Sequence, residues 1–142
     1  MMLVVDASIA TKWLIREEGT AEAWRFAGRY GRNLNAPDLL LAEVSGVLVR
    51  LANQRQILAA VATERLAWWS ETCQQGALEL HRLTPHFVHG AGNLAIELGH
   101  PIKDCIYLAL ADQLGCPLAT SDVKFRDRVT DPARVKLLAE LV

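Results

Sequence analysis

Short apolar runs alternate with longer amphipathic stretches along the chain. Residues 2–5 are all apolar and end at Asp6, which predicts a strand that is covered on both faces. We predict further strands at 33–36, 77–81, 117–120 and 134–138. Helical spacing of apolar residues predicts helices at 8–16, 20–30, 37–53, 57–74, 85–98 and 103–114. This alternation predicts an α/β fold, in which a mostly parallel central sheet has helices on both faces.

Two acidic residues follow predicted strands. Asp6 comes directly after the first strand, and Asp122 comes two positions after the strand at 117–120. Because ligands bind at the carboxyl ends of the strands in open α/β sheets, both residues are expected at one edge of the sheet. Aspartate is also a favoured helix N-cap, and taken alone that structural role explains either residue.

Two more acidic residues lie in predicted helices. Glu43 is at the margin of the apolar stripe of helix 37–53. Burying an unpaired carboxylate is costly, so Glu43 is expected to contact a bound cation or to pair with an arginine. Asp104 is in the first turn of helix 103–114, before seven consecutive apolar residues, where the helix dipole favours a carboxylate.

The four carboxylates together predict a metal site. At one sheet edge they would repel one another, and some would take up protons. A divalent cation removes this repulsion, and Mg²⁺ or Mn²⁺ prefers oxygen ligands of this kind. Such a site suits the hydrolysis of phosphodiesters. The predicted ligands and catalytic residues are Asp6, Glu43, Asp104 and Asp122.

Four segments carry a family resemblance. They are VVDAS at the amino end, APDLLLAEVSGVL around Glu43, IKDCIYLALA around Asp104 and LATSDVKF around Asp122. In this order, and over nearly the whole chain, they resemble the PIN domain family, and within it the toxin ribonucleases of VapBC toxin–antitoxin pairs. The resemblance implies a single PIN domain over residues 1–142, with a parallel sheet of about five strands.

The resemblance also implies roles for particular residues. The four carboxylates correspond to the acidic quartet with which the family binds Mg²⁺ or Mn²⁺ and hydrolyses RNA. Ser8 and Thr120 correspond to hydroxyl residues that orient these carboxylates. Family members frequently carry Asn three positions after the Glu, where this chain has Gly46, so one hydrogen bond near the site is expected to be missing.

Partners follow from the same resemblance. It implies an endoribonuclease toxin that leaves 5′-phosphate and 3′-hydroxyl ends and that a VapB-type antitoxin keeps inactive. Toxins of this family use a hydrophobic surface to form homodimers and to bind the antitoxin. Trp68 and Trp69 are candidates for such a surface, although tryptophans in apolar helical patterns more often belong to the core.

Two alternatives use the same residues differently. A phosphatase-like or receiver-like α/β domain would use Asp6 as its nucleophile. A phosphatase of haloacid dehalogenase type has a second Asp where this chain has Ser8, and a receiver has paired acids near the end of the first strand, which this chain lacks. A non-catalytic PIN-like interaction module, with the two tryptophans as an exposed anchor, would not cleave RNA when metal is present.

The charge balance gives no strong sign of nucleic-acid binding. The 142 residues include 16 acidic and 15 basic ones, for a net charge of −1. Setting aside the four proposed ligands leaves 12 acidic residues against the 15 basic ones. Several basic residues flank the last two motifs and are candidates for contacts with RNA phosphates. They are Lys103, Lys124, Arg126 and Arg128.

The sequence shows no feature of export or of membrane insertion. The start MMLVVDAS has no basic region and reaches an Asp after five apolar residues, unlike a signal peptide. The longest apolar run has seven residues, too few to span a bilayer. Three cysteines without CxxC spacing suit a reducing compartment. We therefore expect a cytoplasmic protein without a membrane partner.

Overall fold

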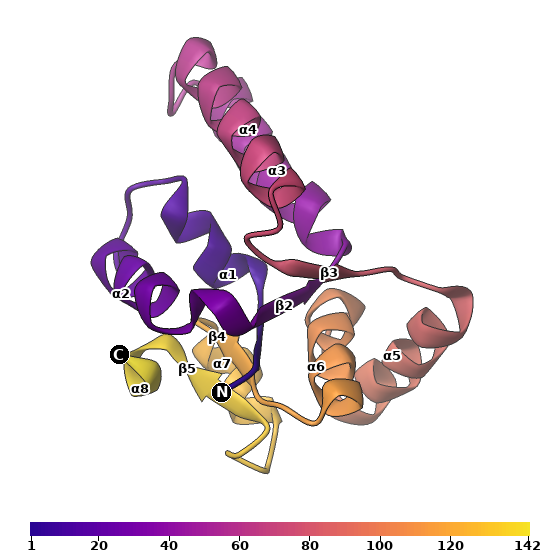
Figure 1. Ribbon diagram of the computed structural model, residues 1–142. Coiled ribbons are helices and arrows are strands. Elements are labelled where there is room, and N and C mark those ends of the chain that lie inside the picture. Colours follow the sequence, from indigo (N-terminus) through magenta and orange to yellow (C-terminus); the bar gives the residue numbers. More distant parts are fainter.

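A five-stranded parallel sheet runs through the computed structural model, which describes residues 1–142 (Figure 1). The strand order is β3-β2-β1-β4-β5, and all neighbouring strands are parallel, which confirms the predicted fold class. The strands are β1 (Leu3–Val5), β2 (Leu34–Pro37), β3 (Glu79–His81), β4 (Leu118–Thr120) and β5 (Val135–Leu137). The chain adds β2 and β3 on one side of β1 but places β4 and β5 on the other, so the topological switch point lies between β1 and β4.

Helices connect the strands, as the sequence pattern predicts. The five long ones are α2 (Thr20–Tyr30), α3 (Leu39–Asn53), α4 (Ala59–Gln74), α5 (Pro85–Leu98) and α6 (Ile102–Leu114). The shorter segments are α1 (Ala7–Ala10), η1 (Thr11–Trp13), η2 (Gly31–Asn33), α7 (Val123–Arg128) and α8 (Leu138–Leu141). The predicted helix at 8–16 is therefore divided into α1 and η1, and α7 and α8 were not predicted because they are too short to show a periodic pattern.

The layers follow from the apolar faces of the helices. Figure 1 shows α5 and α6 on one side of the sheet, and α1 and α2 on the other. The apolar run of α6 is almost entirely buried, because this helix packs on β1 and β2 and is covered by α5. Helices α3 and α4 pack side by side and project from the sheet as an arm (Figure 1). No helix is both long enough and apolar enough to cross a bilayer.

The boundary between β2 and α3 differs from the prediction. Pro37 was expected to open the helix, but it is the last residue of β2, and α3 begins at Leu39. A proline cannot donate a hydrogen bond to a neighbouring strand. The hydrogen bond to the neighbouring strand is donated by the next residue, because the Asp38 N–H donates to the carbonyl of His81 at 2.8 Å.

Candidate active site

The switch point places Asp6 at the end of β1, beside the end of β4. Its side chain begins α1, because Oδ1 accepts hydrogen bonds from the Ser8 N–H at 3.1 Å and the Ile9 N–H at 3.4 Å. The Ser8 hydroxyl donates to the same oxygen at 2.6 Å, and the Thr120 hydroxyl donates to Oδ2. Asp6 is 4% exposed, so this carboxylate is both a helix cap and a buried charge with no cation beside it.

The two hydroxyl residues connect the ends of β1 and β4. The Ser8 oxygen accepts a hydrogen bond from the Ser121 N–H at 2.8 Å, and the Thr120 oxygen accepts one from the Asp122 N–H at 3.0 Å. Asp122 in turn begins α7 by accepting the Phe125 N–H at 3.0 Å. The backbone that carries Asp122 is therefore tied to the residues that orient Asp6.

Glu43 reaches this edge of the sheet from α3. Its side chain is 18% exposed, and Oε1 accepts a hydrogen bond from the Tyr107 hydroxyl at 2.6 Å. Lys103 Nζ lies 3.6 Å from Oε2. Glu43 therefore pairs with a lysine and a tyrosine, and not with the arginine that was the expected alternative to a cation. Burial and the bond to Glu43 raise the pKa of Tyr107, which keeps its hydroxyl protonated and able to donate.

Asp104 lies against Asp122 and a histidine. Its Oδ2 is 2.6 Å from His100 Nε2, and one ligand atom each from His100, Asp104 and Asp122 lie within 4.8 Å of one another. Asp6 and Glu43 do not belong to this tighter cluster. The sequence reasoning missed His100 and Tyr107. Helical spacing was a signal for Tyr107, which lies three positions after Asp104 on α6, whereas His100 lies in the connection before this helix and gave no such signal.

Negative charge dominates the site. Burial above all, and also the charge of Asp104, raise the pKa of Asp6 from its ordinary value of 3.8 to about 6. The charges of Glu43, Asp6 and Asp104 all act on Tyr107, so the three carboxylates surround this hydroxyl. Lys103 is the only lysine or arginine that pairs with any of the four carboxylates. A surplus of carboxylate oxygens over cations is the donor set that a hard divalent cation requires.

The four candidate RNA-binding cations are placed differently from one another. Lys103 points to Glu43, and Arg126 forms an ion pair with Glu140 at 2.5 Å. Lys124 and Arg128 are exposed on α7, directly after Asp122. The Arg128 guanidinium also comes close to the turn at Gly99, with Nη1 3.7 Å from the position of a Cβ there. Neither Lys124 nor Arg128 forms an ion pair with a carboxylate of the chain.

Gly46 leaves an open space on α3, one turn beyond Glu43. A Cβ built at this position meets no atom within 4 Å. No side chain replaces the asparagine that the family often carries here, so Tyr107 and Lys103 are the only hydrogen-bonding or charged partners of the Glu43 carboxylate.

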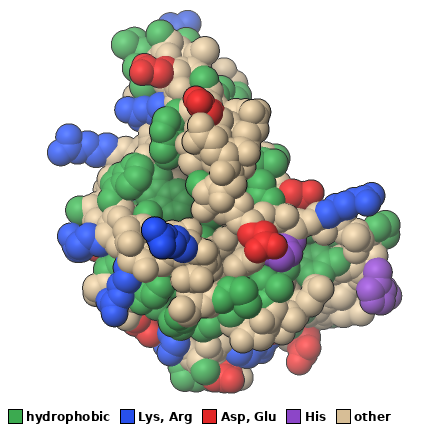
Figure 2. Space-filling view, viewed as in Figure 1, with side chains coloured by type: hydrophobic (Ala, Val, Ile, Leu, Met, Phe, Trp, Pro, Cys, Tyr) green, Lys and Arg blue, Asp and Glu red, His purple; other side chains and the backbone are tan.

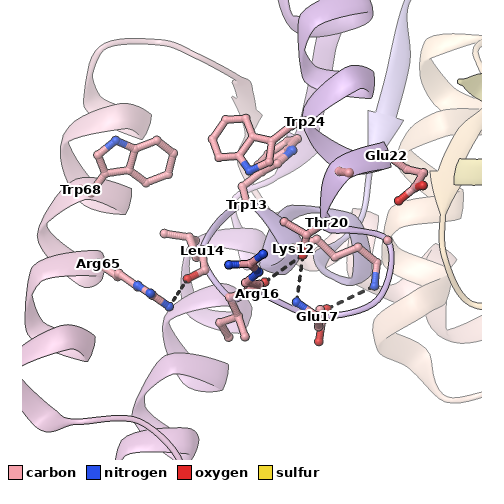
Figure 3. A pocket seen from close by; sticks show the side chains of 13 residues that line it. Lys12, Trp13, Leu14, Arg16, Glu17, Thr20, Glu22, Trp24, Arg65 and Trp68 are labelled. Atoms are coloured by element: carbon pink, nitrogen blue, oxygen red, sulfur yellow. Dashed lines mark hydrogen bonds and ion pairs between the residues drawn. The ribbon is translucent and has the colours of Figure 1, made fainter.

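A separate apolar cleft of about 740 Å³ lies between the arm and α2. Figure 3 shows Trp68 and Arg65 on α4 facing Trp13 and Trp24. Trp24 and Trp68 are 48% and 42% exposed, and their rings meet edge to face with centroids 6.3 Å apart. In the space-filling view, hydrophobic atoms line this hollow and basic side chains lie at its margin (Figure 2). Trp69, by contrast, is 2% exposed and belongs to the core, so the predicted pair of exposed tryptophans is wrong for Trp69.

Fold and sequence together define the class of protein. The model of the PIN domain family matches residues 3–129, and the chain belongs to this family. Two curated relatives are VapC ribonuclease Mb0985 from Mycobacterium bovis and ribonuclease VapC9 from Mycobacterium tuberculosis. Each is 30% identical over 128 residues, which cover 89% of this chain and 90% of the relative.

Two solved structures share the fold. PAE2754 from Pyrobaculum aerophilum superposes with a TM-score of 0.71 at 17% identity, covering 98% of this chain and 90% of its own. VapC20 from Mycobacterium tuberculosis, a toxin that cleaves the sarcin–ricin loop, gives a TM-score of 0.70 at 14% identity, covering 93% and 98%. At these identities the likeness concerns the fold.

Proposed function

We propose that this chain is a VapC-type toxin, a metal-dependent endoribonuclease that hydrolyses RNA phosphodiester bonds. The observation that carries the proposal is the meeting of Asp104 and Asp122, with ligand atoms within 4.8 Å, beside the buried Asp6 at the switch point of the sheet. The 30% identity to VapC ribonucleases over 89% of the chain supports the same activity. The proposed catalytic and metal-binding residues are Asp6, Glu43, Asp104 and Asp122.

Mg²⁺ or Mn²⁺ is the proposed cofactor. When bound to these carboxylates, such an ion supplies an activated water and stabilises the leaving oxygen of the phosphodiester. The residues of the chain prepare this site in advance. The Ser8 hydroxyl holds one oxygen of Asp6 and the Thr120 hydroxyl holds the other, so that the carboxylate cannot rotate freely. Tyr107 does the same for Oε1 of Glu43.

Substrate binding is proposed at the same edge. The exposed Lys124 and Arg128 follow Asp122 on α7, and we assign them contacts with RNA phosphates. Arg126 is engaged with Glu140, so it would have to leave this ion pair to contribute. Lys103 would release Glu43 in a similar way once a divalent cation neutralises that carboxylate.

The inhibiting partner is proposed to be a VapB-type antitoxin that inserts an apolar segment into the cleft between α4 and α2. The exposed Trp24 and Trp68 offer the aromatic anchors that protein partners commonly bind. Arg65 donates to the Leu14 carbonyl at 2.7 Å and thereby fixes the arm against the loop after η1. The cleft is therefore formed before any partner arrives. A homodimer also remains a prediction, for which the 83% exposed Ile96 on α5 is a candidate contact.

The alternatives receive less support. A phosphatase of haloacid dehalogenase type would have a second Asp where this chain has Ser8, and Ser8 instead donates a hydrogen bond to Asp6. A non-catalytic interaction module is favoured by the exposed cleft, but it does not explain four carboxylates at one sheet edge.

RNA cleavage tests the proposal directly. Purified protein is incubated with total RNA and Mn²⁺ or Mg²⁺, with and without a chelator. We expect cleavage only with metal, products with 5′-phosphate ends, and no cleavage by Asp104→Asn. Asp127→Asn, which removes an exposed carboxylate of α7, serves as the matched control and should keep full activity. Cleavage that persists in chelator, or in Asp104→Asn, would refute the assignment.

A further inference from the structure

His100 occupies a short connection that fixes its position between two helices. It follows Gly99, the left-handed C-cap of α5 with φ at 62°, and it precedes Pro101, the N-cap residue of α6. A residue before proline is restricted to extended conformations. The backbone therefore has little freedom at His100, and the ring starts from a defined place one turn before Asp104.

Two contacts hold the ring in that place. Nε2 lies 2.6 Å from Oδ2 of Asp104, and the ring packs on Phe125 in a tilted arrangement with centroids 4.6 Å apart. Phe125 belongs to α7, whose N-cap is Asp122. The side chain of His100 is 13% exposed. His100 thus touches both of the elements that carry Asp104 and Asp122.

The donor atoms already lie close enough to share one ion. The nitrogen of His100 and one oxygen each of Asp104 and Asp122 are within 4.8 Å of one another. Small adjustments of these side chains would therefore let all three atoms bind the same ion. Imidazole nitrogen is a common ligand of transition metals, whereas Mg²⁺ binds chiefly to oxygen.

We propose that His100 is a nitrogen ligand of the divalent cation, together with Asp104 and Asp122. This inference rests on the proposed metal-dependent function and makes its metal site more specific. The mixed nitrogen and oxygen donor set favours Mn²⁺ over Mg²⁺, because manganese accepts nitrogen more readily than magnesium does. His100 thereby sets the metal preference of the site, and the hydrogen bond to Asp104 holds its ring ready while no ion is bound.

The test is made on the full chain loaded with Mn²⁺. Electron spin-echo envelope modulation of bound Mn²⁺ detects a directly coordinated nitrogen, independently of catalysis. We expect nitrogen modulation in the wild type, its loss in His100→Gln, and its retention in the control His89→Gln, which changes an exposed histidine of α5. In titration calorimetry, His100→Gln should raise the Kd for Mn²⁺ by about tenfold or more and the Kd for Mg²⁺ by less than about threefold.

The outcomes separate this inference from the proposed function. Bound Mn²⁺ without nitrogen modulation in the wild type, or modulation that survives in His100→Gln, would overturn the role of His100 and leave the carboxylate site intact. A wild-type chain that binds no Mn²⁺ at all would overturn both. If His100→Gln does not fold, the wild type labelled with ¹⁵N-histidine decides the question, because replacing ¹⁴N must change the modulation when a histidine is the ligand.

Discussion

Replacing Asp6 with Asn should stabilise the metal-free protein, and more so at neutral than at acidic pH. Asn keeps an oxygen that accepts from Ser8 and Ile9, and its amide can donate to Thr120, so the packing changes little. What disappears is the charge. Burial raises the pKa of Asp6 from 3.8 to about 6, which means that the folded chain resists its ionisation.

The magnitude follows from the linkage between the pKa and folding. Because the folded-state pKa lies above the unfolded one, the penalty is absent well below pH 3.8 and complete above about pH 6. At about 1.4 kcal/mol per pKa unit, the full penalty on the free energy of unfolding is about 3 kcal/mol. At pH 4.5 only about 1 kcal/mol of it has developed. The advantage of Asp6→Asn should therefore grow by about 2 kcal/mol between pH 4.5 and pH 7.5.

Urea unfolding in the presence of a chelator measures this difference at both pH values. The control is Asp127→Asn, which removes an exposed carboxylate and should show no gain that depends on pH in this way. Saturating Mn²⁺ should reverse the order, since it stabilises the wild type through Asp6 and the variant much less. A metal-free Asp6→Asn protein that is less stable than the wild type at pH 7.5 would refute the reasoning, because the ionised carboxylate would then be a stabilising structural group.

Three further predictions concern other parts of the chain. Tyr107→Phe removes the hydrogen bond to the Glu43 carboxylate and should lower the free energy of unfolding by about 1–3 kcal/mol. It should also lower the rate of RNA cleavage. Urea unfolding and a cleavage assay measure the two effects, and unchanged values in both would contradict the role of Tyr107. Gly46→Ala should raise the free energy of unfolding by about 0.5–1 kcal/mol, because the added Cβ meets no atom and alanine favours the helix; a lower melting temperature would show that the space is not free. Trp68→Ser should weaken antitoxin binding by about tenfold or more in calorimetry and leave cleavage intact, whereas equal affinity would exclude the cleft as the docking site.

The amino-acid sequence by itself determined the order and type of the main elements. Apolar periodicity records which residues of a segment face the core, and this signal is local, so the five strands and the five long helices were predicted close to their observed limits. The strand-end positions of Asp6 and Asp122 followed from the same pattern, since parallel strands end at one edge. Short α7 and α8 gave no such signal.

Only the tertiary structure decided which side chains meet. Two adjacent residues of a helix point in directions about 100° apart, and only packing shows that Trp69 is the one buried in the core while Trp68 is exposed. The contacts of His100 with Phe125 and of Tyr107 with Glu43 join residues from different elements. Such contacts depend on how the helices cross the sheet, which no local pattern encodes. For the same reason the burial of Asp6, and with it the pKa of about 6, became visible only in the folded chain.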